Sequence, residues 1–216
     1  VAAVRAVAQV CGLTPRIKWP NDLVYDGRKL GGILCESVVL GSETAVVLGI
    51  GILTTAAKAD MVSEENLALA YKMMTTLNKS ARDIMVKYDV HACTDVTGFG
   101  LLGHSFEMAQ GSGCTVHIQV DRVPYHPEAL ELAAMGLIPA GAYRNREYAQ
   151  AGVEIRGNVS LAMEDILYDP QTSGGLLFAL PADEAEACLT RLKQTIPHAA
   201  IIGYVTQKED SHIVLE

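Results

Sequence analysis

One segment near the middle of the chain restricts the fold more than any other. An apolar run at Val90–Thr94 predicts a strand, a glycine-rich loop follows, and a helical pattern over about Phe99–Gln110 stops at Gly111. An alternating run at Thr115–Val120 then predicts a second strand. Strand, helix and strand in this order indicate an α/β domain, because a helix between two strands covers one face of a sheet.

The rest of the carboxy-terminal part also alternates between helical and extended patterns. Ser63 opens a long helix that continues to Tyr88, because its apolar residues recur at the helical spacings of three and four. Further helices and strands are predicted at Glu128–Met135, Leu161–Leu167, Gly175–Leu180, Asp183–Gln194, Ala199–Val205 and His212–Leu215. These elements predict the α/β class, with a mixed sheet flanked by helices.

The first fifty residues have a different pattern. A helix is predicted at Val1–Val10, and strands are predicted at Ile17–Asp26, Lys29–Leu40 and Thr44–Ile52. Turns are expected at Asp26-Gly27, a strong hairpin signal, and at Gly41-Ser42. The pattern changes near Gly51. We therefore expect two domains, with a helix and a β-meander in residues 1–50 and the α/β domain in residues 51–216.

Composition narrows the functional classes. Half of the 216 residues are hydrophobic and the formal net charge is -8, so a globular chain is expected and a nucleic-acid surface with clustered Lys and Arg is not. The five cysteines are too widely spaced for a disulfide framework or a zinc site. No stretch has the length and apolar character of a membrane span or a signal peptide. The sequence predicts a cytoplasmic protein that acts on small molecules.

The glycine loop has more than one interpretation. Residues 98–103 read G-x-G-x-x-G and Asp121 follows the next strand, which is the spacing of a dinucleotide-binding fingerprint. Glycines and free amides at a helix start favour phosphate. Asp95 would repel that phosphate unless Mg²⁺ lay between them, which favours a metal-phosphate site. The third interpretation is a simple turn in which Asp95 and Thr97 cap the helix.

A second loop, residues 169–175, combines hydroxyls, an amide and glycines between a helix and a strand. It fits an ordinary turn. It also fits a wall of the same ligand site, because Gly174 and Gly175 permit close backbone approach and Thr172 and Ser173 offer hydrogen-bond donors. The loop residues alone leave both interpretations open.

Four motifs in order make residues 51–216 similar to the carboxy-terminal half of selenophosphate synthetases, also called selenide, water dikinases. They are GILTTAAKA at 51–59, HACTDVTGFGLLGH at 91–104, YRNR at 143–146 and DPQTSGGLL at 169–177. The family resembles the aminoimidazole ribonucleotide synthetase superfamily, whose carboxy-terminal α/β domain closes an ATP site. The resemblance disfavours the dinucleotide interpretation.

The resemblance implies phosphoryl transfer from ATP to selenide, giving selenophosphate, with Mg²⁺ required. Asp95 matches a carboxylate that binds the metal. The loop residues expected at the ATP site are Thr97, Gly98, Gly100, Asp169, Thr172, Ser173 and Gly174. The remaining metal ligands and the family's nucleophile belong to its amino-terminal half, so we expect no catalytic residue in this chain and Cys93 is not that nucleophile. A homodimer, or pairing with an amino-terminal half, is expected.

Residues 1–50 are instead similar to part of the catalytic domain of biotin-protein ligases. The similarity rests on IKWPND at 17–22, GRKLGGIL at 27–34 and VLGIGI at 47–52. It implies that Lys29 once contacted biotinyl-adenylate and that Asn21 and Asp22 lay at its nucleotide site. The adenylate loop of that family is absent from this sequence. Two alternatives to phosphoryl transfer therefore stay open: a catalytically silent binding or dimerisation module, and a biotin-protein ligase remnant.

Overall fold

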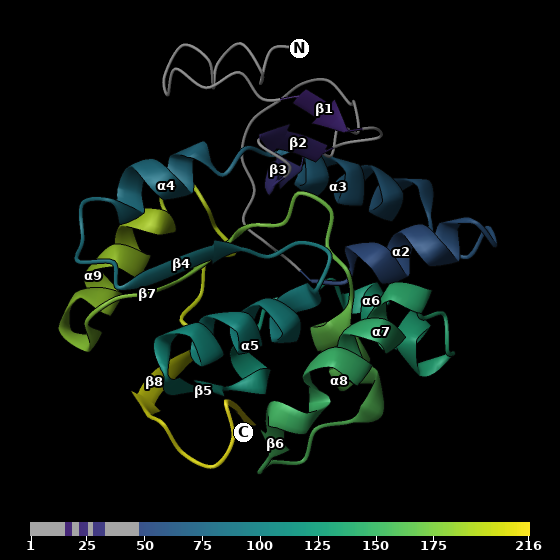
Figure 1. Ribbon diagram of the computed structural model, residues 1–216. Coiled ribbons are helices and arrows are strands. Elements are labelled where there is room, and N and C mark those ends of the chain that lie inside the picture. The colour runs from purple at the N-terminus through teal and green to yellow at the C-terminus, as the bar shows by residue number, and fades with distance from the viewer. Residues whose placement is uncertain (1–15, 19–21, 26–27, 33–47) are drawn as a thin grey trace. The chain divides into compact units, whose positions relative to one another are not determined.

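The structure is a computed structural model that describes residues 16–18, 22–25, 28–32 and 48–216 (Figure 1). The chain divides into two compact units, Val1–Val39 and Leu40–Glu216. Among the described residues, no helix is long and apolar enough to cross a membrane.

The smaller unit contains a three-stranded antiparallel sheet. Its strands, in the order β1-β2-β3, are Arg16–Lys18, Asp22–Tyr25 and Arg28–Gly32. The prediction of one strand over Ile17–Asp26 is wrong, because β1 and β2 pair with each other and Ile17 faces Leu23. The sequence between them contains Pro20, which lacks the amide donor that a continuous strand needs.

The predicted hairpin agrees with the antiparallel pairing of β2 and β3. Lys29 lies in β3, where only the first part of the predicted Lys29–Leu40 strand is described. Several predicted features lie outside the described residues, namely the Val1–Val10 helix, Asn21, and the turns at Asp26-Gly27 and Gly41-Ser42.

The larger unit interleaves helices with two sheets. The helices are α2 (Ile50–Ala57), α3 (Glu64–Thr75), α4 (Lys79–Met85), α5 (Gly100–Ser112), α6 (Pro127–Ala134), α7 (Ala140–Ala149), α8 (Leu161–Tyr168) and α9 (Ala182–Leu192). The strands are β4 (Ala92–Asp95), β5 (Cys114–Ile118), β6 (Val153–Ile155), β7 (Leu176–Ala179), β8 (Gly203–Gln207) and β9 (Ile213–Leu215), with short 3₁₀ turns at Val120–Arg122 and Gln150–Gly152.

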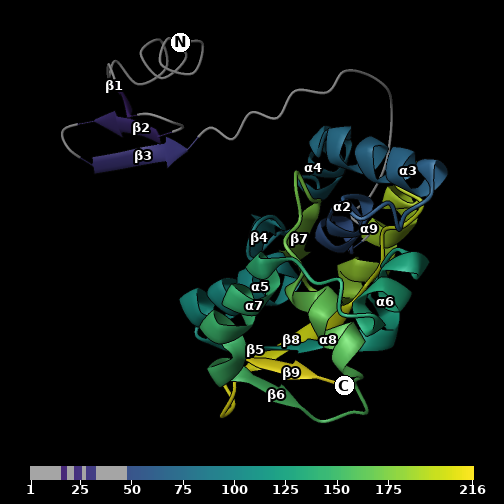
Figure 2. The same ribbon diagram turned by 90° about the vertical axis from the view of Figure 1, so that its right-hand side faces the viewer.

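The four-stranded sheet is mixed and has the order β6-β9-β5-β8. Its central strand β5 pairs antiparallel with β8 and parallel with β9, and β6 pairs parallel with β9. Both ribbon views place α5, α7 and α8 on one side of this sheet (Figures 1 and 2). The predicted α/β class with a mixed sheet flanked by helices is confirmed.

The strands on either side of α5 belong to different sheets. β4 pairs antiparallel with β7 in a sheet of two strands, whereas β5 lies in the four-stranded sheet. A dinucleotide fold needs these two strands parallel in one sheet, with the phosphates at their carboxyl ends. The topology therefore excludes the dinucleotide interpretation of the glycine loop.

The segment after Leu48 is helical, so the predicted Thr44–Ile52 strand is wrong over its described end. Leu48 makes a single parallel bridge with Tyr125, Gly49 has a left-handed φ of 108°, and α2 starts at Ile50. Its apolar, β-branched residues suggested a strand because a buried helix and a buried strand have similar composition. Four residues of this segment belong to the core: Leu48, Ile50, Ile52 and Leu53.

The long predicted helix from Ser63 is two helices. Ser63 caps α3 as expected, since its hydroxyl accepts a hydrogen bond from the amide of Asn66 at 3.2 Å. The chain is extended at Thr76, and α4 begins three residues later. The Thr76 hydroxyl bonds back to the carbonyl of Lys72 at 2.8 Å, a local alternative to helix continuation.

Smaller differences between the predicted and observed elements concern where elements begin or end and two elements that were not predicted. Helix α5 ends with Gly113 in a left-handed conformation, not at Gly111. Strand β8 begins four residues later than the predicted Ala199–Val205 strand. Helix α7 and strand β6 were not predicted, because α7 is strongly polar and β6 is only three residues long.

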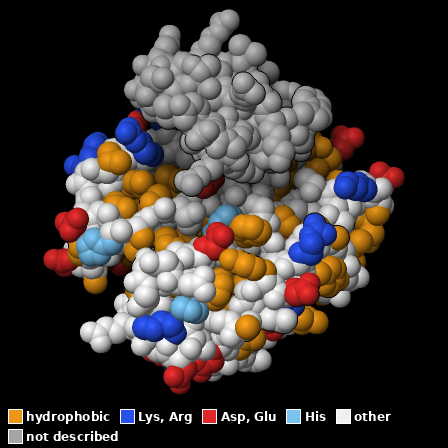
Figure 3. All heavy atoms as spheres, in the orientation of Figure 1, with side chains coloured by type: hydrophobic (Ala, Val, Ile, Leu, Met, Phe, Trp, Pro, Cys, Tyr) orange, Lys and Arg blue, Asp and Glu red, His pale blue; other side chains and the backbone are white. Residues whose placement is uncertain are grey.

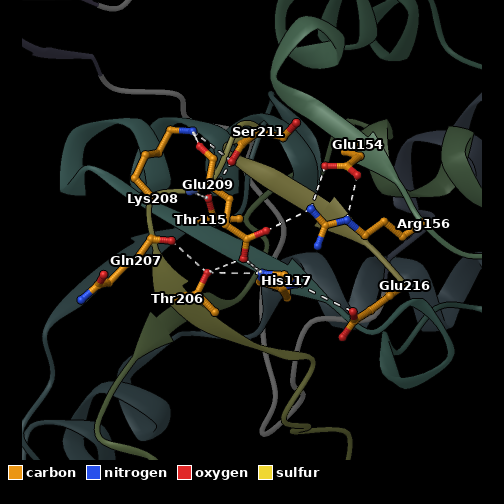
Figure 4. Close-up of polar contacts among 10 residues, drawn as sticks. All are labelled: Thr115, His117, Glu154, Arg156, Thr206, Gln207, Lys208, Glu209, Ser211 and Glu216. Atoms are coloured by element: carbon orange, nitrogen blue, oxygen red, sulfur yellow. Dashed lines mark hydrogen bonds and ion pairs between the residues drawn. The ribbon is translucent and has the colours of Figure 1, made fainter.

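A polar network ties the end of the chain to the four-stranded sheet (Figure 4). His117 is 3% exposed on β5, and its Nε2 lies 2.8 Å from Oε1 of Glu209. The other oxygen of Glu209 accepts a hydrogen bond from Arg156 at 2.9 Å. The backbone amide of Glu209 donates to Thr115 at 2.8 Å. Glu209 thus joins β5 to the segment after β6. Its hydrogen bonds, the one from Arg156 first, hold its pKa down at about 2.

We predict that Glu209→Gln destabilises the protein at neutral pH and that this difference shrinks in acid. A carboxyl group with a lowered folded pKa contributes stability above its usual pKa, and that contribution is lost as the pH falls through the folded value. Thermal unfolding at about pH 7 and about pH 3 measures this difference. Glu131→Gln, at an exposed position, is the matched control. Equal destabilisation by Glu209→Gln at both pH values would contradict the assignment.

Candidate functional site

The two predicted loops lie against each other at one end of the β4–β7 pair. The amide of Val96 donates to the carbonyl of Gly175 at 2.8 Å, which extends the pairing of the strands by one step. The amide of Gln171 donates to the carbonyl of Thr97 at 3.0 Å. Residues 95–100 and 169–175, far apart in the sequence, therefore form one surface.

Two glycines permit this close approach. A side chain at Gly174 would place its Cβ 1.8 Å from the carbonyl oxygen of Val96. Gly100 has a φ of 69°, and a Cβ there would lie 2.8 Å from the backbone of Tyr168. At both positions the missing side chain makes room for the protein's own backbone. Gly98 differs, because a Cβ there would meet nothing within 4 Å, so its backbone faces open space.

Asp95 ends strand β4 with an exposed carboxylate. Cys93 is exposed on the same face of the strand, and its thiol pKa is raised by partial burial and by the charge of Asp95. A thiol with a raised pKa is a poor nucleophile at neutral pH. Thr97 is half-buried, and its hydroxyl lies 3.1 Å from Nε2 of His104 on α5.

The carboxylate of Asp169 points into the protein. Asp169 is 0% exposed, and its Oδ2 accepts hydrogen bonds from the amide of Gly51 at 2.8 Å and from Nε2 of Gln171 at 2.9 Å. Oε1 of Gln171 in turn accepts from the amide of Ile50 at 3.4 Å. Asp169 and Gln171 therefore cap the start of α2, where a negative charge is favoured by the free amides. A Cβ on Gly51 would lie 2.5 Å from Oδ1 of Asp169, so glycine is needed there.

Burial raises the pKa of Asp169 to about 7, against the opposing influence of the amides of Ile52 and Gly51 and of Gln171. Other residues of this loop are more open. Thr172 is half-buried, and Ser173 is exposed with a left-handed φ of 49°. Such a φ is uncommon for a residue other than glycine and is often found at functional sites. Of the predicted loop residues, Asp95, Gly98 and Ser173 are therefore the ones that a ligand can reach most directly.

Helix α7 supplies a residue that links both loops. Nδ2 of Asn145 donates to the carbonyl of Gly98 and to the carbonyl of Tyr168, each at 2.9 Å. Asn145 is 5% exposed. Sequence reasoning included it in the YRNR motif but gave it no role. A buried polar residue next to two arginines on a short helix was the available signal.

The chemistry of these residues fits part of a magnesium site. Mg²⁺ prefers oxygen ligands and is commonly bound by one or two carboxylates together with phosphate oxygens. Among the described residues, no group of three or more His, Cys, Asp and Glu could hold a metal ion. Asp95 would therefore supply one ligand and bound phosphates or other residues the rest. On the face shown in Figure 3, Lys and Arg side chains are scattered and form no basic patch.

The residues expected from the similarity to biotin-protein ligases are only partly described. Asp22 begins β2 and pairs with Gly32, and Lys29 of β3 pairs with Val24 of β2. Asn21 is outside the described residues. The pairing places Asp22 and Lys29 on neighbouring strands, in the hairpin that the sequence predicts.

We predict that Asp169→Asn removes a pH dependence of stability. The raised pKa means that the folded protein holds a proton more tightly than the unfolded chain, so wild-type stability falls as the pH rises from about 4 to about 7. Asparagine keeps an acceptor for Gly51 without the buried charge. Urea unfolding at about pH 5 and about pH 8 should show a loss only in the wild type. Asp121→Asn, at an exposed residue, should behave as wild type, and an unchanged pH dependence in Asp169→Asn would refute the assignment.

Comparison with known proteins was made by family model and by sequence. Residues 36–216 match the model described as AIR synthase related protein, C-terminal domain, and residues 2–52 match that of the biotin/lipoate A/B protein ligase family. A selenide, water dikinase of Clostridium botulinum is 46% identical over 169 residues, which are 78% of this chain and 49% of that protein. One of Treponema denticola is 46% identical, with 95% of this chain and 61% of that protein covered. The chain thus spans about half the length of the curated relatives.

Solved structures agree on the fold alone. The hydrogenase maturation protein HypE of E. coli is 17% identical with a TM-score of 0.50, and covers 78% of this chain and 44% of its own. A HypE structure in complex with ATP is 18% identical with a TM-score of 0.50, and covers 81% of this chain and 48% of its own. The four sequence motifs predicted a similarity to selenide, water dikinases. The relatives from Clostridium botulinum and Treponema denticola confirm it. The chain belongs to the family of AIR synthase related proteins, of which residues 36–216 form the carboxy-terminal domain.

Proposed function

We propose that the larger unit forms the carboxy-terminal part of the Mg·ATP site of a selenide, water dikinase, the enzyme that transfers a phosphoryl group from ATP to selenide and yields selenophosphate. The observation that carries the proposal is the meeting of residues 95–100 and 169–175 at one surface. These two motifs lie in a chain that is 46% identical to enzymes of that name. A related fold, that of HypE, has been solved in complex with ATP.

In this proposal the chain contributes positioning and charge. Asp95 offers hard carboxylate oxygen to Mg²⁺, which when bound neutralises the phosphate oxygens. The backbone at Gly98 and the start of α5 favour an anion, and Thr172 and Ser173 offer hydroxyl donors to phosphate. Phosphoryl transfer depends mainly on such positioning and electrostatic stabilisation. Asp169 and Gly174 act in the proposal by holding the loop that carries these donors.

The remaining ligands and the nucleophile come, in this proposal, from residues that correspond to the other half of the relatives. The partner is an amino-terminal half or a second copy of the chain, and the reaction takes place in the cytoplasm. One carboxylate with a few hydroxyl donors gives a weak Mg·ATP site, because the phosphates lack most of the positive charge they require.

Two other functions have specific support. The surface formed by the two loops is also compatible with a catalytically silent binding or dimerisation module. The match of residues 2–52 to the biotin/lipoate ligase model supports a biotin-protein ligase remnant in the smaller unit. Incubation with biotin and ATP distinguishes this remnant, since an active ligase would release pyrophosphate and form biotinyl-adenylate.

We predict that Mg·ATP binds to this chain and that Asp95→Asn weakens the binding by at least about tenfold, a loss of about 1.4 kcal/mol. The reason is that asparagine keeps the shape of the side chain and removes the charge that attracts the metal. Isothermal titration calorimetry of Mg·ATP into the full chain provides the measurement. Asp121→Asn, an exposed carboxylate after β5, is the control and should bind as wild type. Equal binding by wild type and Asp95→Asn would remove Asp95 from the site. No binding by the wild type would favour the silent module.

A further inference from the structure

Asn145 contacts both loops of the proposed site through a single nitrogen. Its Nδ2 lies 2.9 Å from the carbonyl oxygen of Gly98, in the glycine loop, and 2.9 Å from that of Tyr168, the last residue of α8 and the one directly before the second loop. An amide nitrogen has two hydrogens, so these two bonds use its full donor capacity. With 5% of the residue exposed, water cannot easily replace either bond.

The two carbonyls need this particular kind of side chain. Aspartate has the same shape but only acceptor oxygens, which would face two carbonyl oxygens and repel them. An apolar side chain would leave the buried carbonyl of Tyr168 without this donor and would remove the link to Gly98. Glutamine keeps both hydrogens but places them one methylene further from the backbone of α7. Asparagine therefore combines the donors and the length that this position requires.

Helix α7 is itself fixed in place. Arg146, the next residue, makes ion pairs with Glu164 and with Asp165 on α8, the latter at 2.8 Å. Its guanidinium also lies 4.8 Å from the ring centre of Tyr168. Burial lowers the pKa of Arg146, but the hydrogen bonds that it donates to Asp165 and Glu164, together with their charges, outweigh burial and raise the pKa, so the charge persists. Because these ion pairs fix α7 against α8, the side-chain amide of Asn145 keeps its position relative to Gly98 and Tyr168.

The loops are also joined at Thr97. Its carbonyl oxygen accepts hydrogen bonds from the amide of Gly100 and from the amide of Gln171, each at 3.0 Å. Gly100 lies against the backbone of Tyr168 so closely that a Cβ would clash. The bond from Gly100 lies within the glycine loop. Movement of one loop away from the other would therefore free the amides of Gln171 and Val96, the latter bonded to the carbonyl of Gly175 at 2.8 Å. Their rate of hydrogen exchange reports directly on the contact between the loops.

We propose that Asn145 is a positioning residue, which sets the distance between the glycine loop and the 169–175 loop and so shapes the phosphate-binding surface. The inference deepens the proposed function and rests on it for the identity of the ligand. Asn145 acts through Gly98 and Tyr168 and has no contact of its own with the substrate in this scheme. Its role is mechanical, since it holds two backbone segments in one geometry.

Amide hydrogen exchange of Asn145→Asp, followed residue by residue by NMR on the full chain, tests the inference. We expect the amides of Val96 and Gln171, whose bonds join the two loops, to exchange at least about tenfold faster, because the repelled carbonyls let the loops separate. The amide of Val116, which bonds to the carbonyl of His212 in the four-stranded sheet, should keep its rate. Asn145→Gln, which retains both donors, gives the same test in a milder form if the aspartate variant does not fold.

A matched control comes from α3. Nδ2 of Asn66 donates to Glu128 at 2.6 Å, so Asn66→Asp removes one amide donor elsewhere and should leave the exchange of Val96 and Gln171 unchanged. Unchanged exchange of these two amides in both Asn145 variants would overturn the inference. Acceleration that includes Val116 to the same degree would also overturn it, because that pattern is a general loss of stability.

Titration of Mg·ATP separates this inference from the proposed function. If the wild type binds, Asn145→Asp should bind at least about tenfold more weakly while Asn66→Asp binds as wild type. Binding by Asn145→Asp at wild-type strength would show that the distance between the loops does not matter for the ligand, and would overturn the inference. Absence of binding by the wild type refutes the proposed function, and the exchange rates then decide alone whether Asn145 holds the loops together.

Discussion

The carboxylate of Asp169 at the start of α2 is the interaction on which the arrangement of the larger unit depends. It joins Gly51 to the loop after α8 across 118 residues of sequence, at a position with no exposure to water. A buried carboxylate is unfavourable unless donors surround it, and here the free amides of a helix start and Gln171 supply them. These bonds satisfy Oδ2 only, since Oδ1 is buried without a hydrogen-bond partner, and burial outweighs the donors and raises the pKa of Asp169 to about 7.

Several other features follow from this contact. The loop that begins at Asp169 turns immediately toward β4, where Gln171 donates to Thr97 and Gly174 passes close to Val96. The glycine loop is thereby confined between α7 and the 169–175 loop. Gly100 and Gly174 permit the packing of backbone on backbone, and Gly51 makes room for the carboxylate of Asp169. Only Gly98 is left with open space beside it, so the part of the motif available to a ligand is small.

The difference between local patterns and long-range contacts explains what could be predicted from the sequence. Amphipathic helices such as α6 and α9, and alternating or apolar strands such as β5 and β7, were predicted because their residues carry the period of the element. The start of α2 could not be predicted, since it is fixed by a side chain 118 residues away. The separation of β4 and β5 into two sheets is likewise a long-range property that no local pattern contains.

The sequence predicted which residues lie at the candidate site better than it predicted what each of them does. The exposed carboxylate of Asp95 and the open backbone at Gly98 lie where a strand followed by a glycine loop would place them. Asp169 was expected beside ATP because it belongs to a loop of hydroxyls and glycines, yet its carboxylate is directed to α2. The direction of a side chain depends on which backbone amides lie unpaired nearby, and those amides belong to a helix that the sequence did not predict.

Charge places a limit on what the described surface can do by itself. The loops present one carboxylate, a few hydroxyls and backbone amides, and Mg·ATP carries more negative charge than these donors can balance. Arg146, the residue after Asn145 on α7, is already paired with Glu164 and Asp165. In the proposed function, phosphoryl transfer on this surface therefore needs cations and carboxylates from beyond the two loops. The described surface then contributes one part of a nucleotide site that another polypeptide segment completes.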